Sequence, residues 1–102
     1  MLEQLTRTGL AENLHTRFRL RLAPDRTSQL ELVELNETRT APDREAFAVL
    51  FRGDANDALD QGMYRMEHPT LGAFDLFIVP VAQDQTGRYY EAVFNRLLPH
   101  GG

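Results

Sequence analysis

Cysteine, tryptophan and lysine are all absent from the 102-residue sequence. Without cysteine, the chain has no disulfide bond, no thiolate nucleophile and no zinc–thiolate site. Without lysine, Schiff-base chemistry and the lysine of a phosphate-binding loop are excluded as well. Serine occurs once, at Ser28, in a polar stretch that lacks the glycine-flanked turn of a serine nucleophile. These absences exclude several common routes to covalent catalysis.

Strong positive charge and long apolar runs are also missing. The formal net charge is −4, whereas a nucleic-acid-binding surface needs clustered positive charge. No apolar run approaches the length of a membrane span. Residues 1–5 lack the basic start and apolar stretch of a signal peptide. We therefore expect no nucleic-acid and no membrane partner. A cytoplasmic location is the default expectation, with export without a classical signal peptide left open.

Length and composition suit a single domain over residues 1–102. Apolar residues make up 42% of the chain and charged residues 25%, which is typical of a globular domain with its own core. Residues 1–15 are expected to form a helical N-terminal segment, with Leu10 and Leu14 on one face and Thr8 as the N-cap. Residues 97–102 are expected to form a mobile tail.

Alternating apolar and polar residues predict a series of short strands. In 16–22, apolar residues alternate with three arginines, so one face is buried and the other is lined by arginine. The alternation changes parity at Leu32–Val33, which predicts a β-bulge. The expected fold is mainly β, a small antiparallel β-sandwich or barrel of about six strands with a short N-terminal helix. Further strands are predicted at 47–52, 63–68, 74–81 and 88–95, with turns at 69–72 and 84–87.

Several short motifs occur together in the second half of the chain. They are F-R-G at 51–53, Q-G-M-Y at 61–64, H-P-T-L-G at 68–72, L-F-I-V-P-V at 76–81 and Y-E-A-V-F-N at 90–95. In combination they resemble an uncharacterised bacterial family of short β-rich proteins, a domain of unknown function. No activity is established for that family, so the resemblance implies none. It implies instead an assembly or accessory role beside phage-tail-like fibre proteins.

His68 is the first candidate for chemistry. It precedes Pro69, with Glu67 beside it and Asp75 across the turn, and a histidine next to a carboxylate can act as an acid or base. A single histidine without a second one nearby is a poor metal-site pattern. The favoured interpretation is structural, with a ring N–H capping the turn at Pro69. We therefore assign no catalytic residue, no metal site and no cofactor.

A barrel fold offers a second candidate, a small-ligand site at the barrel mouth near Tyr64, His68 and Tyr90. The glycines of 61–64 and 71–72 are interpreted as backbone requirements, for positive φ or close approach of another strand. The Asp-rich loop at 54–60 lacks the glycine and the glutamate that an EF-hand needs. We interpret it as a solvated loop.

The alternating arginines Arg17, Arg19 and Arg21 form a stripe that could bind an acidic partner or a phosphate group. Glu31 and Glu34 occur in the next predicted strand. Cross-strand ion pairs between these arginines and the two glutamates are the favoured interpretation.

The run 75–81 is apolar on both faces of its predicted strand. One face can cover the core of the domain, so Phe77, Val79 and Val81 on the other face are the candidate interface residues. Pro80 cannot donate to a β-ladder, and we expect it at a sheet edge or strand end. The leading hypothesis is a non-enzymatic structural or interaction domain that self-associates or binds a larger protein. The alternatives are a small-ligand-binding β-barrel module and an enzyme that uses His68 with a carboxylate.

Overall fold

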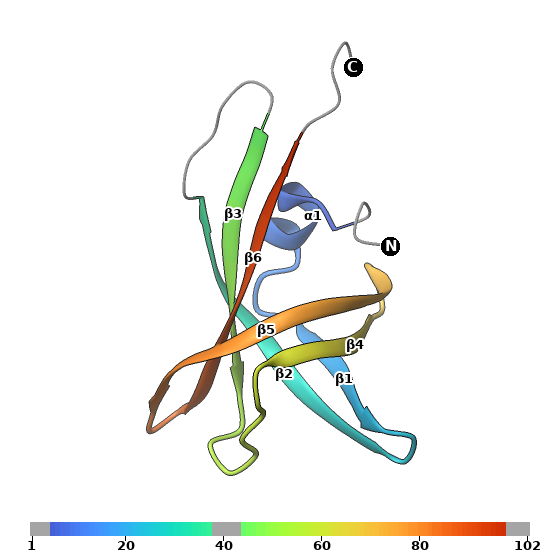
Figure 1. Ribbon diagram of the computed structural model, residues 1–102, viewed down its shortest axis with the longest axis vertical. Coiled ribbons are helices and arrows are strands. Elements are labelled where there is room, and N and C mark those ends of the chain that lie inside the picture. The colour runs from blue at the N-terminus through green and yellow to red at the C-terminus, as the bar shows by residue number, and fades with distance from the viewer. Residues whose placement is uncertain (1–4, 38–43, 98–102) are drawn as a thin grey trace.

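The computed structural model describes residues 5–37 and 44–97 and arranges them as one helix and six strands (Figure 1). The six strands close into an antiparallel barrel with the order β1-β2-β3-β6-β5-β4. The predicted class, a mainly β fold of about six strands with a short N-terminal helix, is confirmed. The elements are α1 (Arg7–Glu12), β1 (Arg17–Ala23), β2 (Arg26–Glu37), β3 (Arg44–Gly53), β4 (Gly62–His68), β5 (Gly72–Asp84) and β6 (Gly87–Leu97).

The barrel interior is filled by apolar side chains, as in other small barrels. Phe18 lies at its centre, with ring centroids 5.2 Å from Phe51 and 6.2 Å from Phe74. Phe47 stacks on Phe94 at 4.6 Å. Each of these rings is buried because strand alternation turns it inward, while the arginines of β1 point out.

Three register shifts interrupt the strand pairing. The first lies between Arg21 and Ala23 where β1 pairs with β2. The second lies between Leu32 and Glu34 where β2 pairs with β3, which confirms the predicted bulge. The third lies between Pro80 and Ala82 where β5 pairs with β6.

The expectation that Pro80 marks a strand end is wrong, because β5 continues to Asp84. The alternative, an edge, holds locally: β4 pairs with β5 only as far as Ile78, so at Pro80 the strand is paired with β6 alone and the missing backbone N–H can be accommodated.

Helix α1 covers the end of the barrel between β6 and the β4–β5 turn (Figure 1). Its N-cap is Thr6, whose Oγ1 accepts a hydrogen bond from the Gly9 N–H at 2.9 Å, so the prediction of Thr8 is wrong. Leu10 is buried in the core, and Leu14 packs against it. At six residues, α1 is far too short to cross a membrane, and the described residues contain no helix that could do so.

Glycines in the motifs have different roles. Gly72 has φ +88° in the β4–β5 turn, which confirms a need for positive φ. A Cβ at Gly53 would lie 2.6 Å from Leu30 Cδ2, so the F-R-G motif ends where a core side chain leaves no space. Gly62 has neither constraint, since the nearest atom to its Cβ would be 3.9 Å away. The predicted mobile tail at 97–102 lies outside the described residues beyond Leu97, which ends β6.

Candidate functional site

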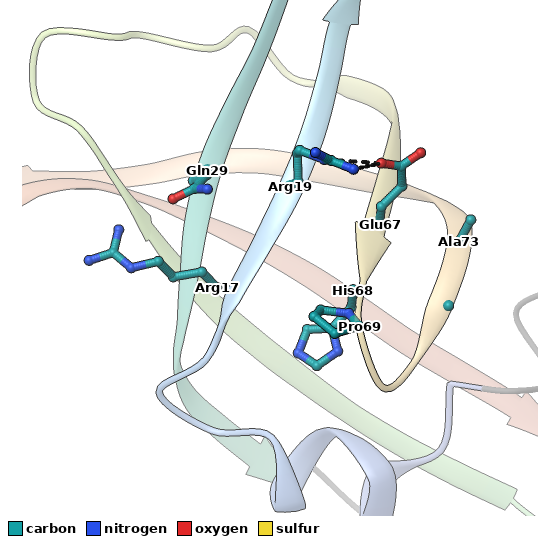
Figure 2. A pocket seen from close by; sticks show the side chains of 8 residues that line it. Arg17, Arg19, Gln29, Glu67, His68, Pro69 and Ala73 are labelled. Carbon is teal, nitrogen blue, oxygen red and sulfur yellow. Dashed lines mark hydrogen bonds and ion pairs between the residues drawn. The ribbon is translucent and has the colours of Figure 1, made fainter.

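An open depression of about 620 Å³ lies on the outer side of the barrel beside His68 (Figure 2). β1 runs between β2 and β4 here, and the start of β5 lies beside β4, so residues from four strands meet at one surface. The residues that line it are Arg17, Arg19, Gln29, Glu67, His68, Pro69, Gly72 and Ala73.

His68 has partners for both ring nitrogens. Nδ1 accepts hydrogen bonds from the backbone N–H groups of Thr70 at 3.0 Å and Leu71 at 3.2 Å. Nε2 lies 2.9 Å from Thr16 Oγ1, which in turn donates to the Asn13 carbonyl at 2.6 Å. Since Nδ1 accepts two N–H groups, the proton of the neutral ring is on Nε2. His68 therefore caps the turn as an acceptor, and the prediction of a capping ring N–H is wrong.

The surroundings of His68 favour its neutral form. The side chain is 7% exposed and lies against the Phe18 ring, with centroids 4.5 Å apart. Burial lowers the pKa of His68 below its ordinary value. This environment suits a structural hydrogen-bond network.

The two carboxylates considered as partners of His68 bind arginines instead. Glu67 accepts from Arg19 at 2.7 Å and from Arg21 at 3.3 Å, and these bonds lower the pKa of Glu67. Asp75 pairs with Arg65 at 3.4 Å on the exposed side. Strand alternation explains the separation, because Glu67 points outward where the neighbouring His68 points inward. Within the described ranges, no group of three His, Cys, Asp or Glu side chains could hold a metal ion.

Tyr64 and Tyr90 do not join His68 in this depression. Tyr90 is fully buried, and its phenol oxygen accepts the Leu59 backbone N–H at 3.0 Å. The Tyr64 hydroxyl donates to the Asp60 carbonyl at 2.7 Å, and burial, followed by Asp60, raises the pKa of Tyr64. Both tyrosines therefore anchor the loop between β3 and β4. Sequence reasoning missed Leu59 as the buried anchor of that loop.

The arginine stripe pairs with a strand that the sequence did not indicate. Arg19 lies directly opposite Glu67 of β4 in the strand register and binds it through Nε and Nη2. The predicted pairing with Glu31 and Glu34 of β2 is wrong. Only the closure of the barrel brings β4 beside β1, and closure leaves no local signal in the sequence.

Arg17 lies directly opposite Glu31, yet Glu31 binds a different arginine. Its carboxylate accepts from Arg52 of β3 at 2.7 Å and lies 3.7 Å from His15 Nδ1. Glu34 accepts from Asn36 at 2.8 Å. Among the residues that the structure describes, the Arg17 guanidinium has no hydrogen-bond or ion-pair partner.

A second surface lies on the outer face of β4 and β5 and is apolar. We define the apolar strip as Met63, Phe77, Val79 and Val81. Met63 is 64% exposed, Phe77 46% and Val81 50%, while Val79 is half-buried. Met63 and Phe77 are cross-strand partners. The sequence indicated the three β5 residues, but Met63 joins them only through the β4–β5 register.

The family comparison agrees with the resemblance of the motifs. The family model "Domain of unknown function (DUF6916)" matches residues 5–94, which is most of the chain. The chain therefore belongs to this family. No curated protein and no solved structure matches it.

Proposed function

We propose that this member of the DUF6916 family is a non-enzymatic interaction domain that docks onto another protein surface through the apolar strip. The observation that supports the proposal is the exposure of Met63, Phe77 and Val81 on the outside of a barrel whose interior is already filled. A contiguous apolar surface with a polar rim is typical of protein–protein contact sites.

The rim of the apolar strip consists of charged side chains. Arg65 and Asp75 form a cross-strand ion pair two residues from Met63 and Phe77 on the same two strands. Glu91 of β6 lies opposite Val79. An interface core of aromatic, methionine and valine side chains inside such a rim matches the usual anatomy of an interface.

The strip can supply useful binding energy. Full burial of a Phe or Met side chain stabilises by about 1.5–3 kcal/mol. Phe77 is already about half covered in the single chain, so docking would add roughly half of that amount, and Met63 somewhat more. These side chains would supply only part of the binding energy, because association also costs translational and rotational freedom, so the partner must add further contacts around the strip.

The barrel interior offers less support for the small-ligand alternative. Tyr90 and the central phenylalanines occupy the space that a ligand would need. Both nitrogens of His68 are engaged in hydrogen bonds, and its candidate carboxylates bind arginines. These contacts favour an outer docking surface over a binding or reaction chamber.

From the resemblance of the sequence motifs, we further propose that this interaction serves an assembly or accessory role in a phage-tail-like fibre system. The first partners to test are therefore a second copy of the chain and a phage-tail-like fibre protein.

Sedimentation velocity at micromolar concentration tests the proposal for both partners. We expect self-association or binding of the fibre-like protein, weakened at least about tenfold by the double variant Met63→Ser with Phe77→Ser. Val33→Ser is the matched control, because Val33 is a half-buried valine on β2, which neighbours neither β4 nor β5. Binding that survives the double variant, or that Val33→Ser weakens equally, would contradict the proposal.

A further inference from the structure

The outer face of β1 carries an excess of positive charge on a protein whose net charge is −4. We define the arginine face as Arg17, Arg19 and Arg21, together with Gln29 and Glu67. One carboxylate, that of Glu67, faces three guanidinium groups and binds two of them. The face therefore has two positive charges that its own carboxylate does not balance.

Two further observations add to this excess of positive charge. Arg21 lies directly opposite Arg65 in the β1–β4 register, and like charges in that position repel. Arg17 remains unpartnered among the described residues, because Arg52 takes the carboxylate opposite it. Arg17 lines the depression beside His68 and also a second one, which already holds the carboxylates of Glu31, Asp54 and Asp57. An anionic ligand in the depression beside His68 would balance the charge of Arg17 and reduce the repulsion between Arg21 and Arg65.

The guanidinium groups of Arg17 and Arg19 point in different directions, and this determines which kind of anion they can bind together. In Figure 2, Arg17 extends past β2 beside Gln29, whereas Arg19 turns toward Glu67 on β4. A single phosphate group needs donors that converge on one point. Divergent donors fit separate carboxylates, each of which can accept from the planar fork of an arginine.

We infer that the arginine face binds an extended acidic segment of a protein partner, with carboxylates at alternate positions. Arg17 and Arg19 are two residues apart on a strand, so their Cα atoms are roughly 6.6–6.8 Å apart along it, although their guanidinium groups diverge to its two sides. Alternate residues of an extended peptide that lies along β1 have the same Cα spacing. β1 is paired with β2 and β4 on its two sides, so the segment binds through side chains and adds no strand. This inference is independent of the apolar strip, and either can fail alone.

Fluorescence anisotropy with a short labelled peptide, in which glutamate alternates with threonine, tests the inference on the full chain. We expect saturable binding at low ionic strength, which weakens as salt screens the charges. Arg17→Gln should weaken it about tenfold with an unchanged melting temperature, because Arg17 has no partner to lose.

Arg7→Gln is the matched control, since it removes the same charge from an exposed ion pair with Glu37, away from this face. We expect it to leave the peptide affinity unchanged. Equal loss with Arg7→Gln, or equal binding of a peptide with glutamine in place of glutamate, would overturn the inference. Arg17-dependent binding of inorganic phosphate, or tighter binding of a single-stranded oligonucleotide, would overturn it as well.

Discussion

His68 Nε2 lies 2.9 Å from Thr16 Oγ1, across 52 positions of sequence, and this contact joins the β4–β5 turn to the segment between α1 and β1. The same ring accepts two backbone N–H groups through Nδ1. Protonation of Nδ1 would remove that acceptor and place a charge in a mostly buried site. The fold therefore depends on a neutral imidazole.

Stability should depend on pH through His68. Its pKa is lowered in the folded protein from the ordinary 6.5, so below that pH the unfolded chain binds more protons than the folded one. We expect the free energy of unfolding to be constant above about pH 7 and to fall below pH 6.5, by up to about 1.4 kcal/mol per pH unit.

Urea denaturation between pH 5 and pH 8 checks this prediction at roughly half-unit steps. Glu67 does not contribute to the pH dependence in this window. Its pKa is lowered in the folded protein, so its contribution to the free energy of unfolding is lost only below the ordinary pKa of 4.5. His68→Asn keeps a short acceptor for the turn but cannot titrate. If the free energy of unfolding of that variant falls equally steeply with pH, a group other than His68 causes the pH dependence.

The hydroxyl of Tyr90 should stabilise the fold more than that of Tyr89. Tyr90→Phe leaves the buried Leu59 N–H without its acceptor, which costs about 1–3 kcal/mol. Tyr89→Phe is the matched control, because its hydroxyl bonds Asp84 in an exposed turn where water can substitute, and we expect a loss below about 1 kcal/mol. Urea denaturation measures both variants, and equal losses would argue against the anchoring role of Tyr90.

Alanine should be tolerated at Gly62 but not at Gly87. A Cβ at Gly87 would clash with the Gly53 carbonyl oxygen of β3, so the backbone of one strand must move. We expect Gly87→Ala to cost about 1–3 kcal/mol. Gly62→Ala meets only ordinary contacts and should be neutral, or stabilising by up to about 1 kcal/mol. The opposite ranking in chemical denaturation would mean that the close approach of β3 and β6 is misplaced.

Much of the fold could be predicted because each strand carries its own pattern. The alternation at 16–22 and the change of parity at Leu32–Val33 both correspond to features of the structure. Barrel closure could not be predicted, because it depends on pairing between β1 and β4, which are distant in sequence. Pro80 was correctly associated with a one-sided part of a strand, but the continuation of β5 to Asp84 was missed, because it depends on pairing with β6.

The candidate site was less predictable than the strands. His68 was correctly associated with the turn at Pro69, but its acceptor role depends on Thr16, whose position follows from tertiary packing. The arginines were correctly placed on one face, but their partner is Glu67 on a strand that only closure brings near. Met63 was missed as part of the apolar surface, because its exposure follows from the β4–β5 register.

The most direct test of the apolar strip as a docking surface is site-specific photo-crosslinking in the native host. A benzophenone amino acid is introduced at Phe77 and, as a control, at the exposed Asp25 in the β1–β2 turn. The account predicts that position 77 forms a discrete adduct with a second copy of the chain or with a fibre-like protein, that Met63→Ser reduces this adduct, and that position 25 forms none. Failure of a folded protein to form any adduct at position 77 would contradict it.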